Sequence, residues 1–236
     1  MTDLSAASRK ELIQEISGLR DRIGRLESIL KAIDFPEVLI EYWDDTIGSF
    51  LAVMQIIDPT TADHQKCVSK LARQIALTMN LSAGIVTSCQ MSGLTHDIGK
   101  LAVPTRFLTK PNTLDPHEFN CIVQHTVAGH QILRGIKWPW PVANVALQHH
   151  EKMDGSGYPH KLKGEQACLE ARIVAVADVV HAMCSRRPYR EAMSLQQAFD
   201  EISTQAGIRL YQPAVHACLH AFKDGFSFGQ LSSNPN

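Results

Sequence analysis

The sequence has no Cys-x-x-Cys pair, no long apolar segment and no excess of basic residues. Its six cysteines are scattered, which argues against a zinc ribbon and against a disulfide framework. The longest apolar stretch, residues 50–57, is too short to span a bilayer. The net charge is −1, and lysine and arginine do not cluster, so neither DNA nor RNA is expected as a partner. We therefore expect a soluble cytoplasmic protein without a membrane span.

The composition predicts a folded domain of helices. Hydrophobic residues make up 44% and charged residues 20% of the 236 residues, which provides enough apolar surface for a core. After Pro36 the apolar residues recur with helical spacing almost throughout, and no segment is convincing as a strand. We expect an all-α protein in three parts: a coiled-coil dimerisation helix (1–36), a helical domain (37–228) and a flexible tail (229–236).

A heptad pattern runs through the first of these parts. Its apolar residues are spaced alternately four and three positions apart, as in the seam of a two-stranded coiled coil. They are Leu12, Ile16, Leu19, Ile23, Leu26, Leu30 and Ile33. The flanking charges agree, since Glu15 would face Arg20 of a second copy. The pattern favours a parallel homodimer over the alternative, an amphipathic helix packed on its own domain.

Histidines and aspartates carry the strongest chemical signal. The adjacent pair His96-Asp97 can supply a nitrogen ligand and a carboxylate that bridges two metal ions. Similar residues fall on at least five predicted helices, mostly on apolar faces, where an unpaired polar group is costly. One such histidine alone is more often a core residue, but seven candidates together favour a metal centre. The candidates are His64, His96, Asp97, His125, His149, His150 and Asp178.

The ligand types indicate which metals and which chemistry to expect. Seven nitrogen and oxygen ligands suit two octahedral divalent ions that share one carboxylate, and the absence of thiolates favours iron or manganese over structural zinc. Two ions roughly 3.5–4 Å apart form the pair used for phosphoester hydrolysis.

Three longer motifs narrow this interpretation. Residues 96–100 read HDIGK, residues 149–159 read HHEKMDGSGYP, and residues 187–190 read RPYR. With His64 and Asp178 in the matching order, residues 37–225 resemble the HD-GYP family within the HD superfamily of metal-dependent phosphohydrolases. The resemblance implies a helical HD-type domain. It also implies hydrolysis of cyclic di-GMP to the linear dinucleotide pGpG and on to GMP by a hydroxide that two metal ions activate.

The resemblance assigns the metal ligands. One ion would be held by His64, His96, Asp97 and Asp178, and the other by Asp97, His125, His149 and His150. His125 is preferred over His130 because His125-x-x-x-Gly129 fits the family's pattern. Some members carry a glutamate and bind a third metal at the position of Thr60, so this chain is expected to bind two.

The resemblance also implies catalytic and substrate contacts. Asp97 and Lys100 would be catalytic, the latter by neutralising a substrate phosphate. The substrate contacts would be Lys100, Tyr158, His181, Arg187 and Arg190. Packing is the alternative role for Tyr158, and solvated surface charge is the alternative for the two arginines.

His181 departs from the family, which usually has an aspartate three residues after the last metal ligand. This departure leaves the choice of nucleotide open. One alternative is a phosphodiesterase for another cyclic dinucleotide, such as cyclic GMP-AMP. Another is a weakly active cyclic-dinucleotide-binding module that passes a signal to a protein partner.

Overall fold

The computed structural model describes residues 37–110, 112–185 and 191–229, together with residues 14 and 18. Apart from residues 14 and 18, the predicted coiled-coil segment lies outside the described residues. Arg187, Arg190 and residues 230–236 lie outside them as well. The chain divides into two compact units, residues 1–46 and residues 47–236, and the second unit carries all the described site residues.

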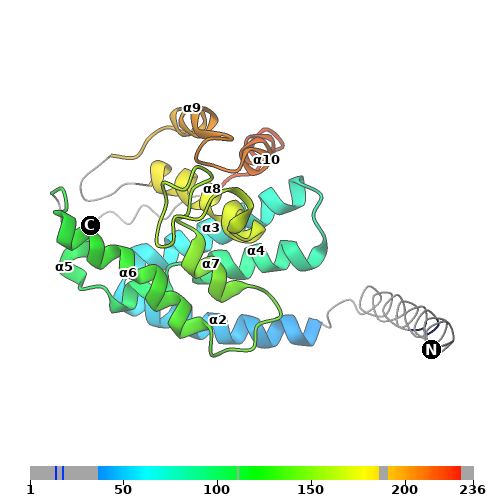
Figure 1. The fold of residues 1–236 in the computed structure, drawn as a ribbon, viewed down its shortest axis with the longest axis horizontal. Helices are drawn as coiled ribbons and strands as arrows, with labels where there is room; N and C mark the ends of the chain where they lie inside the picture. Colours follow the sequence, from blue (N-terminus) through cyan, green and yellow to red (C-terminus); the bar gives the residue numbers. More distant parts are fainter. Residues whose placement is uncertain (1–13, 15–17, 19–36, 111, 186–190, 230–236) are drawn as a thin grey trace, which may run out of the picture. The chain divides into compact units, whose positions relative to one another are not determined.

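The described chain is helical (Figure 1). Its elements are α2 (Glu37–Ile57), α3 (Pro59–Thr78), α4 (Ala83–Thr95), the 3-10 helix η1 (Ile98–Ala102), α5 (Thr105–Leu108), α6 (Pro116–Leu133), α7 (Val142–Gln148), the 3-10 helix η2 (Gly164–Gln166), α8 (Leu169–Cys184), α9 (Leu195–Gln205) and α10 (Gln212–Lys223). No strand occurs among the described residues, so the predicted all-α fold is confirmed. Within the same residues, no helix is long and apolar enough to cross a membrane.

Local capping explains where the two helices that carry His64 and His125 begin. Asp58 precedes α3 and accepts a hydrogen bond from the Thr61 amide (3.1 Å), with Pro59 in the first turn. Asp115 and Glu118 form a capping box at the start of α6, with both hydrogen bonds at 2.9 Å. These contacts satisfy amides that the first helical turn leaves without partners. Both helix starts are thereby fixed by short-range sequence.

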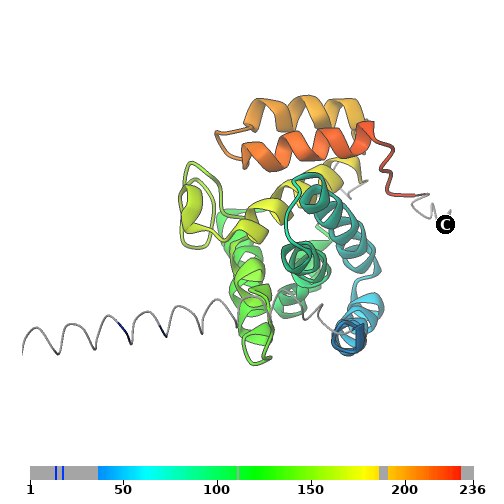
Figure 2. The ribbon, with the colours of Figure 1, turned by 90° about the vertical axis from the view of Figure 1, so that its right-hand side faces the viewer.

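The core of the second unit lies around α8. This helix packs against α3, α4 and α7, and α10 covers α3 and α8. Leu71 and Ile75 of α3 meet Ile173 and Val176 of α8 in one cluster of fully buried side chains. Each such side chain contributes about 1.5–3 kcal/mol by leaving water. Figure 2 shows α9 and α10 side by side, next to α8. The buried α8 therefore holds Asp178 at the centre of the unit.

A close backbone approach joins η1 to α6. A Cβ atom on Gly99 would overlap the carbonyl oxygen of His125 and the amide nitrogen of Gly129. Only glycine allows the two segments to approach so closely. Because Asp97 stands two residues before Gly99, this contact sets the separation between Asp97 and His125.

Candidate metal centre

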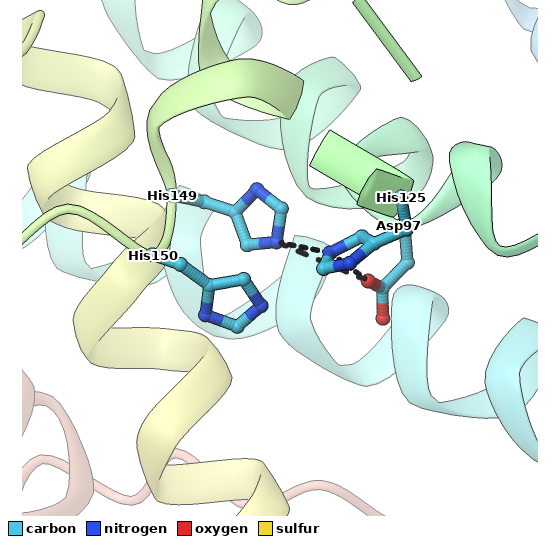
Figure 3. Close-up of side chains that lie close together, drawn as sticks. All are labelled: Asp97, His125, His149 and His150. Carbon is cyan, nitrogen blue, oxygen red and sulfur yellow. Dashed lines mark hydrogen bonds and ion pairs between the residues drawn. The ribbon is translucent and has the colours of Figure 1, made fainter. Parts of the chain in front are cut away.

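The structure brings all seven predicted ligands together from separate helices. His64 lies on α3, His125 on α6 and Asp178 on α8, while His96-Asp97 and His149-His150 directly follow α4 and α7. The potential ligand atoms form two groups, in each of which they lie within 4.8 Å of one another. The first group is Asp97, His125, His149 and His150 (Figure 3), and the second is His64, His96 and Asp178. His130 belongs to neither group.

Asp97 faces both groups through different oxygens. Its Oδ1 lies 3.4 Å from His125 Nε2 and 3.9 Å from His149 Nε2. Its Oδ2 lies 3.4 Å from His96 Nε2 and 3.8 Å from His64 Nε2. This is the arrangement that a bridging carboxylate needs.

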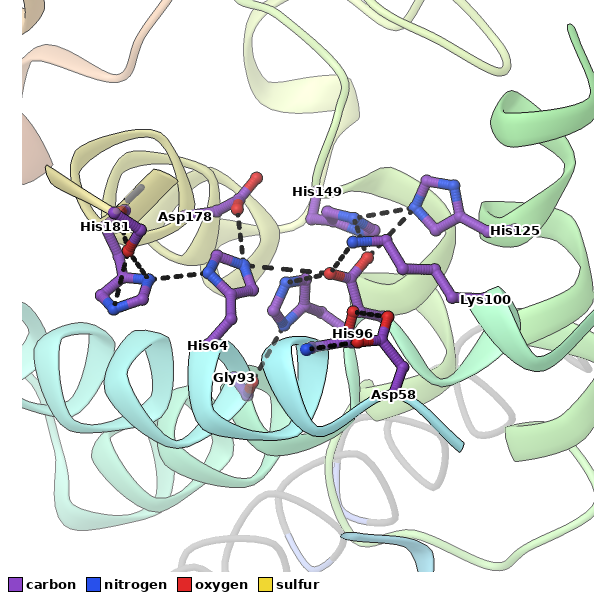
Figure 4. Close-up of polar contacts among 12 residues, drawn as sticks. Asp58, His64, Gly93, His96, Lys100, His125, His149, Asp178 and His181 are labelled. Carbon is purple, nitrogen blue, oxygen red and sulfur yellow. Dashed lines mark hydrogen bonds and ion pairs between the residues drawn. The ribbon is translucent and has the colours of Figure 1, made fainter. Parts of the chain in front are cut away.

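Asp178 lies beside His64 (Figure 4), at the same ring nitrogen that Asp97 Oδ2 approaches. Its Oδ1 is 3.0 Å from His64 Nε2, and its Oδ2 is 3.9 Å from His150 Nδ1. The second carboxylate therefore faces a histidine of each group, although its closer contact is with His64.

Backbone carbonyls fix the orientation of three of the histidines. The Nδ1 atoms of His96, His125 and His149 lie 2.9, 2.6 and 3.0 Å from the carbonyl oxygens of Gly93, Ile122 and Ala146. A carbonyl only accepts, so each Nδ1 carries the proton and donates it. Each Nε2 then presents its lone pair to the centre, as metal-ligating histidines do.

Three buried atoms at the centre lack hydrogen-bond partners. They are His64 Nε2, His96 Nε2 and Asp97 Oδ1. Leaving such atoms unsatisfied costs about 1–3 kcal/mol each. Divalent cations would satisfy them, because imidazole nitrogen and carboxylate oxygen are their ordinary ligands. The residues present fit a metal centre.

The charge states of His149, His150 and Asp97 also fit, whereas, against the effect of burial, the carboxylate of Asp97 raises the pKa of His96. Burial, with the neighbouring His150, holds the pKa of His149 well below its ordinary value, and burial lowers the pKa of His150 to about 3. Burial by itself would raise the pKa of Asp97, but Lys100 and His96 hold it well below the usual range. At neutral pH His149 and His150 are neutral imidazoles and Asp97 is an ionised carboxylate, the forms that bind metal.

Lys100 contacts the bridge directly. Its Nζ donates to Asp97 Oδ2 at 2.6 Å, and its side chain is 16% exposed. The ammonium group therefore lies at the edge of the centre, on the oxygen that also faces His96.

Tyr158 forms one wall of the centre. Its ring packs on that of His150, with centroids 4.8 Å apart and an interplanar angle of 34°. Phe119 of α6 also packs edge-on against Tyr158, with ring centroids 6.0 Å apart. Phe119 is 46% exposed and was not predicted from sequence, because only the fold brings α6 beside the loop that carries Tyr158.

Glu151 has a different role from the one its position next to His150 suggests. Sequence alone suggests that it orients this histidine. Instead, its buried carboxylate accepts hydrogen bonds from the amides of His160 (2.7 Å) and Leu162 (3.0 Å). It therefore fastens the loop that carries Tyr158.

Glu151→Ala is expected to lower the free energy of unfolding by about 1–3 kcal/mol, because two amides lose their acceptor. Urea denaturation followed by circular dichroism would measure this change. Glu165→Ala, on exposed η2, is the matched control and should change stability by less than about 0.5 kcal/mol. Equal stability of the two variants would contradict the role assigned to Glu151.

His181 lies one turn after Asp178 on α8 and is 3% exposed. Its Nδ1 lies 2.7 Å from Nδ1 of His64, and its ring packs edge-on against Phe228 at 5.0 Å. Its side chain thus contacts a predicted metal ligand.

Comparisons with known proteins agree with this geometry. The model of an HD domain matches residues 52–215. A cyclic di-GMP phosphodiesterase of Thermotoga maritima is 40% identical over 185 residues, which are 76% of this chain and 50% of that protein. A 3'3'-cGAMP-specific phosphodiesterase of Vibrio cholerae is 37% identical over 140 residues, which are 59% of this chain and 32% of that protein. The chain therefore spans at most about half the length of these relatives.

A solved structure supports the fold. An HDG"Y"P protein from Bdellovibrio bacteriovorus superposes with a TM-score of 0.60 at 15% identity, over 82% of this chain and 67% of that one. At this identity the similarity concerns the fold alone. Together with the match to the HD domain model, it agrees with the motifs read from the sequence. The chain belongs to the HD domain family, and its predicted resemblance to the HD-GYP phosphodiesterases is confirmed.

Proposed function

We propose that this chain is a metal-dependent phosphodiesterase that hydrolyses cyclic di-GMP to pGpG, GMP or both. The observation that carries the proposal is the position of Asp97, whose two oxygens face two buried groups of ligands. A phosphodiester carries negative charge that grows along the reaction, so its hydrolysis needs a concentrated positive field at one point. The cyclic di-GMP phosphodiesterase from Thermotoga maritima supports the choice of substrate.

Seven residues would hold two divalent ions, iron or manganese, in the arrangement predicted from the resemblance. They are His64, His96, Asp97, His125, His149, His150 and Asp178. When bound, such a pair of ions lowers the pKa of a water molecule and offsets charge on the phosphate. The three backbone-bonded histidines keep their Nε2 lone pairs directed inward, so the chain orients its ligands in advance.

The substrate contacts follow from position and charge. Lys100 adds a cation at the edge of the centre and would contact a phosphate oxygen. Tyr158, which covers His150, would limit access of water and shape the pocket. Arg187 and Arg190 would contact the nucleotide, as the resemblance implies.

A related nucleotide is the second candidate substrate. The relative from Vibrio cholerae is specific for 3'3'-cGAMP, and His181 stands where the family usually has an aspartate. A weakly active module that binds a cyclic dinucleotide and passes a signal to a protein partner is the third candidate.

One experiment separates the three. Protein loaded with manganese or iron is incubated with cyclic di-GMP and, separately, with 3'3'-cGAMP, and the products are resolved by chromatography. We expect cyclic di-GMP to be cleaved faster. Faster cleavage of 3'3'-cGAMP would favour the second candidate. Intact nucleotides in both reactions, with metal confirmed in the protein, would favour the third.

We also propose that the segment 1–36 forms a parallel homodimer ahead of the domain 37–228 and the tail 229–236. The heptad spacing and its flanking charges support this proposal. Light scattering of the whole chain at micromolar concentration would test it, and a monomeric mass would contradict it.

A further inference from the structure

His64 differs from three other histidines of the centre in the group that its Nδ1 atom contacts. His96, His125 and His149 each face a backbone carbonyl, which can only accept a hydrogen bond. The Nδ1 of His64 instead lies 2.7 Å from Nδ1 of His181. An imidazole nitrogen accepts or donates according to where the ring carries its proton, so this contact constrains both rings.

The position of His64 decides the direction of the hydrogen bond. Its Nε2 lies 3.0 Å from Asp178 Oδ1 and 3.8 Å from Asp97 Oδ2, on the side of the metal centre, but makes a hydrogen bond to neither carboxylate. For Nε2 to offer a lone pair there, the proton of a neutral ring must be on Nδ1. His64 Nδ1 then donates, and His181 Nδ1 must be without a proton and accept.

Ser185 lies close to the ring of His181 but does not decide which nitrogen carries the proton. Its hydroxyl donates to the carbonyl oxygen of His181 at 2.8 Å. Its Oγ lies 3.3 Å from both ring nitrogens of His181, and an atom equally far from both lies off the direction of either N–H. The 2.7 Å contact with His64 therefore carries the assignment.

Packing holds the ring of His181 in this place. The side chain is 3% exposed, and Phe228 packs edge-on against it. His181 follows Asp178 by three residues on α8, so both side chains lie on the same face of the helix. One buried helical face therefore presents a carboxylate to Nε2 of His64 and an imidazole to its Nδ1.

We propose that His181 is a positioning residue for the metal centre. As a neutral ring with its proton on Nε2, it accepts the Nδ1–H of His64 and keeps His64 Nε2 directed at the group that contains His96 and Asp178. This role is an alternative to the nucleotide contact expected at His181 from the resemblance. It rests on the metal centre of the proposed function but not on the identity of the nucleotide.

The test compares residues that can and cannot accept this hydrogen bond. His181→Leu fills the site without an acceptor, whereas His181→Asn supplies an amide oxygen. Equilibrium dialysis with Mn²⁺, without nucleotide, measures the affinity of each site. Loss of a partner that orients a ligand typically weakens metal binding about 10–100-fold. We expect such a loss at one of two sites in His181→Leu, an unchanged second site, and recovery in His181→Asn. His220→Leu, at an exposed histidine paired with Asp224 outside the centre, should bind as the wild type does.

A second measurement does not depend on whether a variant folds. In the wild-type protein loaded with diamagnetic Zn²⁺, ¹⁵N-detected spectra of labelled histidines report which nitrogen carries the proton. We expect protons on Nδ1 of His64 and on Nε2 of His181. A proton on Nδ1 of His181, or two undiminished Mn²⁺ sites in His181→Leu, would overturn the proposal. Since neither readout uses a nucleotide, failure of the proposed substrate would leave both results standing.

Discussion

Asp97→Asn is expected to lower the kcat/KM for cyclic di-GMP by at least about 1,000-fold, or about 4 kcal/mol of transition-state stabilisation. The substitution keeps the shape of the side chain but turns one oxygen into an NH₂ group, which cannot bind a metal ion. Because Oδ1 faces His125 and Oδ2 faces His96, one of the two ligand groups must lose its shared oxygen. Lys100 also loses its ionised partner.

Steady-state kinetics of manganese-loaded protein, with the metal content measured in parallel, would test this expectation. Circular dichroism would establish that the variant is folded. Asp63→Asn is the matched control, since Asp63 is an acid on the same unit that pairs with Lys66 at 3.3 Å at the surface. It should keep wild-type activity. If Asp97→Asn kept a tenth of the wild-type rate, Asp97 would not be the bridge.

Gly99→Ala is expected to remove activity through the backbone. The added methyl group would overlap the carbonyl oxygen of His125 and the amide of Gly129. Since these are backbone atoms, η1 must move away from α6, and Asp97 moves with it. Overpacking of this kind costs about 1–3 kcal/mol or more. We expect a destabilisation near the upper end of this range, together with loss of one or both metal ions.

Gly84→Ala tests whether the position of the methyl group matters. A Cβ atom on Gly84 of α4 meets nothing within 4 Å, and alanine favours helix over glycine by about 0.5–1 kcal/mol. This variant should be as stable as the wild type or slightly more stable. Urea denaturation of both variants gives the comparison. A midpoint for Gly99→Ala equal to that for Gly84→Ala would show that the approach of η1 to α6 is not needed.

Local sequence patterns explain why the sequence alone indicates the helical class and the seven candidate ligands. The start of α6 is predicted by four consecutive residues that include Asp115, Pro116 and Glu118, and the structure shows the capping box there. The seven ligands were assigned by motif, and the fold brings them into two groups. Apolar periodicity alone could not have done so, because His96-Asp97 and His149-His150 follow the ends of their helices.

The contacts around the ligands could not be predicted, because they depend on tertiary packing. Glu151 is adjacent to His150 in sequence, yet its carboxylate serves amides nine and eleven residues further on. His181 and His64 are 117 residues apart, and no periodic pattern relates them. Phe119 reads in the sequence as an ordinary aromatic residue of α6, and only the fold shows that it packs against Tyr158.

The spread of the ligands along the chain has a thermodynamic consequence. They run from His64 to Asp178, so two ions that share Asp97 would together cross-link α3, α6 and α8 through side chains that the unfolded chain holds far apart. An ion that binds only the folded chain stabilises it by mass action, by about 2.7 kcal/mol when its free concentration is 100 times its dissociation constant. The fraction of folded protein would then depend on the free concentration of the metal ion. A cell short of the metal would hold less folded protein as well as less active protein.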